Sequence, residues 1–413
     1  MLNRRHFLAG ALTSAAMTVW QRPAFAAANT DSRLVVVILR GALDGLTAVP
    51  PVGDPDYGSV RGALALSAAR SGENAALPLD RLFGLHPALT GLHESYRAGE
   101  LLVVHAVASP YRERSHFDGQ NVIENGGAAP NGSADGWLNR ALLKLPPSPA
   151  RRELGLALGQ NVPLILRGRA EVASWAPSIL PNAGRDFLDR LADLYSEDAA
   201  LSARLSEAVN VADMVEADQD MSAPAAMPPA GGDAKQPGRD GLARLRQITA
   251  NAGKLLAADN GPRVAVFDAT GWDTHANEGA GQGILSARLH GLDQAFVSLR
   301  AALGPVWRQT AVVVMTEFGR TAHINGSRGT DHGTATCALL VGGAVNGGRV
   351  LADWPGLRTA DLYEGRDLKP TLDLRRLLKG VLHEHLAIDA GSLGREIFPD
   401  SSSIAPLAGL IRA

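Results

Sequence analysis

The sequence predicts a three-layer α/β protein with a mostly parallel central sheet. Three observations indicate this class: apolar, β-branched runs recur along the chain, amphipathic segments separate them, and polar loops follow several runs directly. Several runs are continuous rather than alternating, which is typical of strands buried on both faces of a parallel sheet. The alternation of the two kinds of segment predicts helices on both faces of that sheet.

Residues 1–26 have the features of a twin-arginine signal peptide. Arg4 and Arg5 precede an uncharged apolar run, residues 9–20, and Ala24-Phe25-Ala26 offers a cleavage site. The run is shorter than the ~20 residues that span a bilayer. We therefore expect recognition by the twin-arginine export machinery, a periplasmic or exported protein, and no stable membrane anchor after processing.

Seven segments are predicted to be strands from their apolar and β-branched residues. They are Arg33–Leu39, Leu101–Val107, Leu154–Leu158, Val162–Arg167, Arg263–Phe267, Thr310–Thr316 and Cys337–Val341. Amphipathic spacing predicts helices between and after them. These are Pro87–Ala98, Arg185–Val215, Asp240–Ala258, Leu285–Leu303 and Leu372–Leu386.

One segment, residues 217–241, is rich in Pro, Gly, Ala and Asp and has no apolar period. We predict a mobile surface loop there, with a linker between two domains as the alternative. The loop is favoured because the strand pattern resumes at Arg263, so residues 33–413 are expected to form a single domain.

Composition favours an exported globular enzyme or binding protein. The 413 residues are 46% hydrophobic, enough for a large core, and the formal net charge is -2. A charge so near zero gives no reason to expect a nucleic-acid partner or an anionic membrane surface. The single cysteine, Cys337, excludes an intramolecular disulfide and is expected to be buried.

Four polar loops follow predicted strands, and the carboxyl ends of parallel strands meet at one edge of a sheet. In the first loop, Asp44 lies between Gly41 and Gly45. A carboxylate at the end of the first strand suits a metal ion, but Asp is also favoured as a helix N-cap. The residues alone leave both interpretations of Asp44 open.

The second loop places Ser115 beside His116, with Arg112 and Arg114 just before them. Ser115 is a candidate nucleophile, activated by a metal or a base, and His116 is a candidate catalytic residue. Either arginine could hold an anionic substrate through two parallel hydrogen bonds. The alternative is that Ser115 or Asp118 caps the next helix and His116 is an ordinary loop residue.

The third loop carries Asp268, Asp273 and His275. Oxygen and imidazole ligands around one turn suit zinc, manganese, magnesium or calcium, whereas the alternative is a turn rich in aspartate caps.

The fourth loop begins at Glu317, where a predicted buried strand ends, and it carries Asp331 and His332 near its own end. These three residues are candidate metal ligands. Arg320 lies between them and is a candidate to neutralise charge that develops on a substrate. Convergence of the four loops at one edge predicts a single site for divalent metal.

Five motifs resemble the exported bacterial family called domain of unknown function 1501. They read LVVVILRGALDGL, RSHFDGQ, GWDTH, TEFGRT and DHGTATCALLVGG, and they run through most of the mature chain. That family looks like a branch of the alkaline phosphatase/sulfatase superfamily. The resemblance implies an alkaline phosphatase-like fold, with two metal ions at the carboxyl edge of the sheet and a Ser, Thr or formylglycine nucleophile.

The resemblance also implies roles for individual residues. Asp44 matches a ligand of one metal, Asp273 matches a ligand of the other, and Asp268 stands at the place of an upstream carboxylate. Ser115 lies near the expected nucleophile, and His332 matches a late histidine ligand. The chain departs from the pattern at Glu317-Phe318, where phosphatases carry Asp-His, and it lacks the sulfatase sequence C-x-P-x-R around Ser115.

Two functions follow as hypotheses. The first is an exported metal-dependent hydrolase of phosphate or sulfate esters, holding one or two divalent ions and acting on a small anionic ester. The second is a non-catalytic periplasmic binding or accessory protein that keeps the fold.

Overall fold

The computed structural model describes residues 31–69, 71–146, 154–159, 161–176, 195, 198, 200–206 and 237–412, with backbone alone for 237–244. The predicted signal peptide lies outside these residues, as do 217–236 of the predicted loop and most of the predicted helix at 185–215. Residues 237–241, the end of that predicted loop, already belong to a helix, Pro237–Ala257. No described helix has the length and apolar character needed to cross a membrane.

Within the described residues, nine strands form one sheet, ordered β10-β4-β9-β8-β1-β7-β5-β6 with β11 also paired to β4. Their bounds are β1 Arg33–Arg40, β4 Leu101–Ala108, β5 Gly155–Leu158, β6 Val172–Trp175, β7 Val264–Thr270, β8 Thr310–Thr316, β9 Thr336–Val341, β10 Arg349–Leu351 and β11 Leu372–Asp373. The central strand β1 is parallel to β7 and β8, while β9 is antiparallel to β4 and β8. The prediction of a mostly parallel sheet is therefore confirmed.

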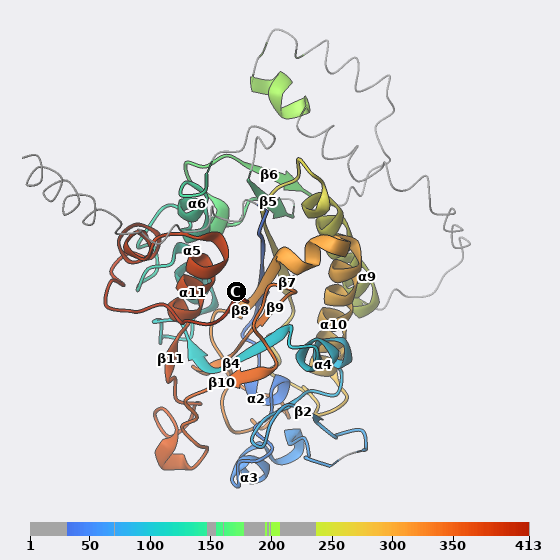
Figure 1. Ribbon diagram of the computed structural model, residues 1–413. Helices are drawn as coiled ribbons and strands as arrows, with labels where there is room; N and C mark the ends of the chain where they lie inside the picture. Colours follow the sequence, from blue (N-terminus) through green and yellow to red (C-terminus); the bar gives the residue numbers. More distant parts are fainter. Residues whose placement is uncertain are drawn as a thin grey trace, which may run out of the picture. The chain divides into compact units, whose positions relative to one another are not determined.

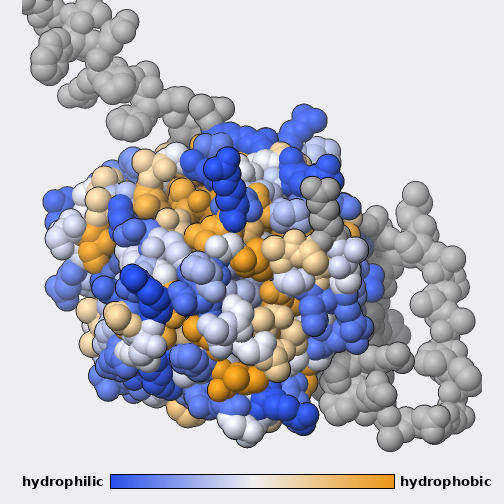
Figure 2. All heavy atoms as spheres, turned by 90° about the horizontal axis from the view of Figure 1, so that it is seen from below, coloured by the Kyte–Doolittle hydropathy of each residue, from blue (hydrophilic) through white to orange (hydrophobic). Residues whose placement is uncertain are grey.

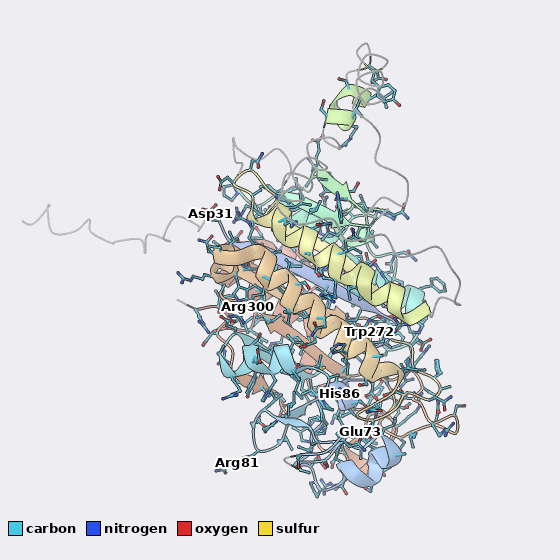
Figure 3. All side chains as sticks on the ribbon, turned by 90° about the vertical axis from the view of Figure 1, so that its right-hand side faces the viewer. Asp31, Glu73, Arg81, His86, Trp272 and Arg300 are labelled. Atoms are coloured by element: carbon cyan, nitrogen blue, oxygen red, sulfur yellow. The ribbon has the colours of Figure 1, made fainter. Side chains whose placement is uncertain are left out.

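Helices cover both faces of the sheet, which confirms the three-layer prediction (Figure 1). One face carries α4 (Thr90–Arg97), α9 (Pro237–Ala257) and α10 (Ile284–Leu303); the other carries α5 (His116–Asn125), α6 (Trp137–Leu142) and α11 (Leu374–Leu386). Figure 3 shows α9 and α10 side by side along the first face. Alternate β1 residues enter the two cores, Val35 and Val37 on the first face and Val36 and Ile38 on the second. A strand buried on both faces needs a continuous apolar run, as the sequence has here.

One predicted strand is wrong. Residues 162–167 form a short 3-10 helix, Leu164–Leu166, instead of a strand. Pro163 has no backbone N–H to donate to a sheet, and the N–H of Ile165 donates to Glu124 Oε2 at 3.0 Å. Ile165 and Leu166 are buried, so their apolar character reflects burial in the core rather than pairing with a neighbouring strand.

The topology gathers four polar loops at one edge of the sheet. Strands β1, β4, β7 and β8 run in the same direction, so their carboxyl ends share that edge. Because β9 runs the other way, it starts at this edge, and the loop 317–335 between β8 and β9 remains there. Short helices α2 (Gly45–Ala48) and α3 (Tyr57–Arg61) follow β1 on the same side. Figure 2 views the molecule from this side, where polar and apolar residues are interspersed.

Candidate metal centre

Three imidazoles and one carboxylate meet at the carboxyl edge. The Nε2 atoms of His116 and His332 are 2.9 Å apart, and those of His275 and His332 are 3.1 Å apart. Asp273 Oδ1 lies 3.0 Å from His275 Nε2 and 3.3 Å from His332 Nε2, while Oδ2 lies 3.5 Å from His116 Nε2. Residues from three separate loops thus direct four potential ligands at one another.

The outer nitrogen of each ring has its own acceptor. Nδ1 of His116 lies 2.8 Å from Glu317 Oε1, and Nδ1 of His275 lies 3.1 Å from Asp331 Oδ1. Nδ1 of His332 lies 3.0 Å from the carbonyl oxygen of Arg114. Such acceptors place the proton of a neutral imidazole on Nδ1 and leave an unshared electron pair on Nε2.

The donor set fits a divalent metal ion. The Nε2 electron pair of His332 faces those of His116 and His275, and such pairs would repel unless a cation or a proton lies between them. In tetrahedral zinc sites, bonds of about 2.05 Å set neighbouring ligands about 3.3 Å apart, close to the separations found here. His116, Asp273 and His332 form the group whose ligand atoms all lie within 4.8 Å of one another. His275 is outside that group, but its Nε2 atom is close to two of its members, Asp273 and His332. Imidazole-rich ligation favours zinc or a similar transition metal over calcium or magnesium.

Glu317 is the principal support of His116. Its carboxylate is buried and accepts hydrogen bonds from the Gln120 side chain at 3.0 Å and the Gly41 backbone N–H at 2.8 Å, besides the contact with His116. Burial acts to raise the pKa of Glu317, but the hydrogen bonds from His116, Gln120 and Gly41 outweigh it and lower the pKa. The same hydrogen bond from His116 to Glu317 is the largest cause of a raised His116 pKa. His116 also stacks on Phe318, with ring centroids 5.0 Å apart.

Arg320 fixes the carboxylate ligand. Its guanidinium is buried and lies 2.5 Å from Asp273 Oδ1, while its other nitrogens bond Thr330. Burial opposes ionisation of Asp273, yet the hydrogen bond and charge of Arg320 keep the Asp273 pKa below its ordinary value. Burial and the neighbouring charge of His116 lower the pKa of His332. Both effects favour the forms that bind metal, an anionic carboxylate and a neutral imidazole.

The structure brings together most of the residues proposed from sequence, with roles that differ among them. Those in contact at this centre are His116, Asp273, His275, Glu317, Arg320, Asp331 and His332. Of these, Glu317 and Asp331 contact the outer nitrogens of His116 and His275, so they hold ligands rather than face the shared point. His116, expected as a catalytic residue, belongs instead to the group that could hold a metal ion.

Asp44 and Asp268, also expected to bind metal, are each paired with an arginine. Asp44 is buried, caps α2 through the N–H groups of Leu46 and Thr47, and forms an ion pair with the fully buried Arg61. Asp268 Oδ2 lies 2.8 Å from Arg40 Nε. Among the described residues, neither Asp44 nor Asp268 forms a hydrogen bond or an ion pair with any of the three histidines. The helix-cap alternative therefore describes Asp44, and a guanidinium supplies the positive charge expected from an ion.

Arg114 and Ser115 occupy the start of α5. Arg114 forms ion pairs with Asp367 at 2.8 Å and Glu364 at 2.6 Å, and it has a positive φ of 59° that accompanies the contact between its carbonyl and His332. Its guanidinium is thus engaged rather than free to hold a substrate. Ser115 is the N-cap of α5, and its side chain makes no capping hydrogen bond.

Sequence reasoning missed several supporting residues. Gln120 was detectable, because it lies four positions after His116 on a predicted helix and must share its face. Arg61, which pairs with Asp44, and Asp367, which pairs with Arg114, were not detectable, because their pairing depends on tertiary contacts rather than on a local motif. Their partners Asp44 and Arg114 are 17 and 253 residues away in the chain.

Comparison with known proteins identifies the family. Residues 103–398 match the model of a family described as "Protein of unknown function (DUF1501)", and the chain therefore belongs to that family. This match covers the second, third and fourth polar loops. No curated protein matches the chain.

Several solved structures are similar in outline at very low sequence identity. Ps i-CgsB in complex with k-i-k-neocarrahexaose is 9% identical, with 91% of this chain and 77% of that chain covered and a TM-score of 0.39. The PsFucS1 sulfatase from Pseudoalteromonas sp. is 12% identical, with 77% and 64% covered and a TM-score of 0.32. Lipoteichoic acid synthase LtaP from Listeria monocytogenes is 10% identical, with 89% and 76% covered and a TM-score of 0.33. At such scores, none of them bears on the chemistry of this site.

Proposed function

We propose that the protein is an exported metal-dependent hydrolase of small phosphate or sulfate esters. The observation that carries the proposal is the convergence of three imidazole Nε2 atoms and the Asp273 carboxylate, each ring being held by an acceptor at Nδ1. The substrate class follows from the resemblance of the chain's family to the alkaline phosphatase/sulfatase superfamily. Export through the twin-arginine machinery follows from residues 1–26.

A divalent ion held by His116, His275, His332 and Asp273 would polarise an ester oxygen and lower the pKa of the attacking hydroxyl. Other groups of the protein hold these four side chains in position for the ion. Glu317, Asp331 and the Arg114 carbonyl hold the three rings, and Arg320 holds the carboxylate, so the ligands need little rearrangement. Ser115, adjacent to His116 and free of a capping bond, is the candidate nucleophile; a water molecule is the alternative.

One ion, rather than two, suits the described residues. Asp44 and Asp268 are paired with Arg61 and Arg40 and, unlike Asp273, which is paired with Arg320, they contact none of the three histidines among the described residues. Both arginines are also tied to other acids: Arg61 lies 3.8 Å from Glu278, and Arg40 lies 2.9 Å from Glu124.

The proposal is tested by metal content and ester hydrolysis on the same preparations. Purified protein loaded with zinc should retain about one ion per chain and hydrolyse an aryl phosphate or aryl sulfate. His332→Ala and Asp273→Asn should lose most of the ion and the activity, because each removes a direct ligand. His323→Ala is the matched control, since His323 is an exposed histidine in the same loop. Equal zinc retention in His332→Ala and His323→Ala would refute the metal centre.

The second candidate function is a non-catalytic binding or accessory protein. One observation supports it: Arg61 and Arg40 pair with Asp44 and Asp268, whereas two-ion catalysis would need these carboxylates unpaired. It predicts that the zinc-loaded protein turns over neither class of ester, and that Ser115→Ala changes nothing measurable. Activity that is lost in Ser115→Ala while zinc is retained would decide for the hydrolase and for Ser115 as nucleophile.

A further inference from the structure

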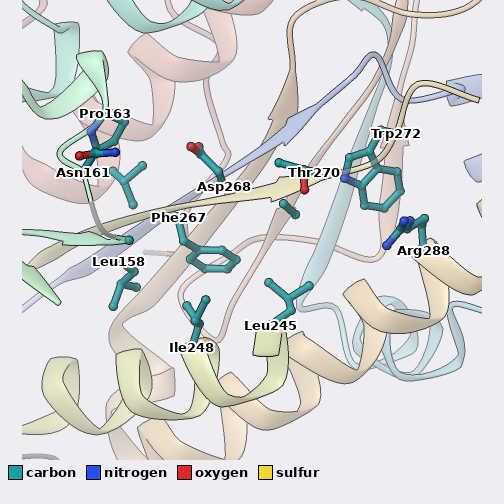
Figure 4. Close-up of a pocket in the computed structure, with 13 residues that line it drawn as sticks. Leu158, Asn161, Pro163, Leu245, Ile248, Phe267, Asp268, Thr270, Trp272 and Arg288 are labelled. Atoms are coloured by element: carbon teal, nitrogen blue, oxygen red, sulfur yellow. The ribbon is translucent and has the colours of Figure 1, made fainter. Parts of the chain in front are cut away.

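A cavity lies beside β7, on the side away from β1. It arises because β5 pairs with a shorter part of β7 than β1 does. The register of β5 with β7 ends at the pair Leu158–Phe267, whereas β7 continues beside β1 to the pair Arg40–Thr270. Within the part of the chain that the structure describes, no strand pairs with the last three residues of β7 on the β5 side. A cavity of about 480 Å³ lies there (Figure 4), within the 300–1,000 Å³ typical of small-molecule sites.

The walls of this cavity are largely apolar. Leu158 and Phe267 come from the two strands, and Leu245 and Ile248 come from α9. A ligand here would bury an aliphatic or aromatic body against them, at roughly 25 cal/mol per Å² of apolar surface removed from water.

Two buried polar atoms of the lining have no hydrogen-bond partner among the described residues. They are Trp272 Nε1 and Asp268 Oδ1. Trp272 is only 1% exposed, and an unsatisfied buried donor costs about 1–3 kcal/mol. Trp272 Nε1 can only donate, so it calls for an acceptor in the cavity. The Asp268 carboxylate points to the other side of β7, away from Phe267 and the α9 side chains (Figure 4), so it is not placed to contact a ligand packed on those side chains.

The cavity also contains a cation without a counter-ion. Arg288 of α10 lines it and makes no ion pair with any described residue. Its guanidinium lies against Gly271: a Cβ built on that glycine, whose φ is +94°, would come within 2.9 Å of the Arg288 Cζ atom. The glycine therefore leaves room for the guanidinium beside Trp272. By contrast, Asp268 is paired with Arg40, which also binds Glu124, so Arg288 is the charged group of the lining that no described residue of opposite charge engages.

We propose that this cavity binds a small organic anion. An aliphatic or aromatic body would pack on Phe267 and the α9 side chains, and an oxyanion group would accept from Trp272 Nε1 and the Arg288 guanidinium. The site is separate from the metal centre, since none of the three histidines lines it. The inference does not rest on the proposed hydrolase activity.

The experiment titrates the full chain with phenylacetate and follows the tryptophan indole N–H signals by NMR. The chain has six tryptophans, and the signal of Trp272 is assigned by its loss in Trp272→Phe, or by through-bond assignment if that variant does not fold. Phenylacetate should shift the Trp272 signal saturably. Phenylacetamide, which has nearly the same shape and no charge, should bind at least about tenfold more weakly, since a hydrogen bond to a charged group is lost.

Two variants locate the anion. Arg288→Met should weaken phenylacetate binding about tenfold or more. Arg300→Met is the matched control, because Arg300 lies on the same helix and is paired with Glu100. The affinity of Arg300→Met for phenylacetate should equal that of the wild type. Benzylphosphonate in place of phenylacetate distinguishes a carboxylate from a phosphoryl headgroup, and a saturable shift with either supports the site.

Any of four results would overturn the inference. These are no shift of the Trp272 signal at tens of millimolar phenylacetate, an equal response to phenylacetamide, an unchanged affinity in Arg288→Met, or a shift that requires zinc. The last would mean that the carboxylate binds at the metal centre. Because the signal reports the cavity directly, a protein inactive toward esters could still show binding here.

Discussion

At the scale of single residues, this site depends on hydrogen bonds that orient rings. Each histidine contributes one nitrogen to the shared point and gives the other to a fixed acceptor, and the three acceptors are chemically different: a buried carboxylate, an exposed carboxylate and a backbone carbonyl. The buried carboxylate, Glu317, is the most constrained, because it also accepts from Gln120 and Gly41.

Glu317→Gln should weaken zinc binding about 10- to 100-fold, the usual effect of losing an acceptor that orients a ligand. The amide keeps the shape but loses the charge that stabilises His116 at Nδ1. Competition with a chromophoric chelator measures the affinity. Glu364→Gln is the control, since Glu364 is exposed and contacts Arg114 rather than a histidine. Equal affinities in the two variants would contradict this role for Glu317.

A second residue-scale prediction concerns Glu278, which is buried beside Asp44. Burial, and then the charge of Asp44, raise the pKa of Glu278 from 4.5 to about 8. The folded protein thus keeps a proton that the unfolded chain releases near pH 4.5, so wild-type stability falls as pH rises from about 4.5 to about 8. Glu278→Gln has no such proton to lose. Asp44, whose pKa is lowered from 3.8, adds its own pH dependence only below that window.

The free energy of unfolding of Glu278→Gln, relative to wild type, should therefore increase between pH 5 and pH 8, by on the order of a few kcal/mol. Urea unfolding at several pH values measures it. A constant difference for Glu278→Gln across this range would show that Glu278 is ionised in the folded protein.

At the scale of elements, the loops form one site because they touch one another through backbone. Gly41, just after β1, has a φ of +120°, and a Cβ there would lie 2.6 Å from the backbone nitrogen of Asp273. The first loop and the third loop thus approach more closely than any side chain would permit. The direction of β9 has a similar effect, because it keeps the segment from Glu317 to His332 at the edge where His116 begins α5.

Gly41→Ala should both destabilise the protein and weaken zinc binding, because it displaces the segment that carries Asp273. Gly72→Ala separates the two causes, since Gly72 has the same φ of +120° but open space around it. We expect Gly72→Ala to cost about 1–3 kcal/mol from backbone strain alone and to leave zinc affinity unchanged. If Gly41→Ala kept wild-type zinc affinity, the close approach of the two loops would have no part in building the site.

At the scale of the whole molecule, the ligands join segments that are far apart in the chain. His116 follows β4, Asp273 and His275 follow β7, and His332 precedes β9. An ion bound by all of them binds the folded protein and not the unfolded chain, so its binding free energy adds to folding stability.

Zinc at 100 times its dissociation constant should raise the free energy of unfolding by about 2.7 kcal/mol and raise the melting temperature accordingly. Calorimetry with zinc and with a chelator measures the shift. His332→Ala should abolish it, and His323→Ala should keep it. A melting temperature that zinc leaves unchanged in the wild type would contradict binding across these segments.

Much of the fold follows from the sequence. The bounds predicted for the strand at Thr310–Thr316 are those observed, and the central strand starting at Arg33 extends only one residue further than predicted. These strands can be predicted from the sequence because burial on both faces requires an uninterrupted apolar run. The strand prediction for 162–167 fails for the same reason, since buried Ile165 and Leu166 give an apolar run without pairing in the sheet. Of the site, the sequence indicated the polar loops and the edge at which they meet.

The sequence by itself determined which chemical groups stand at the strand ends, because strand periodicity and loop composition are local properties. Only the tertiary structure decided which of those groups face one another. Asp44, Asp268 and Asp273 carry the same carboxylate, and each is paired with an arginine, Arg61, Arg40 and Arg320 in turn; among the described residues, only Asp273 also contacts the three imidazoles. The physical reason is that the role of an acid depends on all the groups packed against it, and those groups arrive from remote segments through the direction and register of the strands.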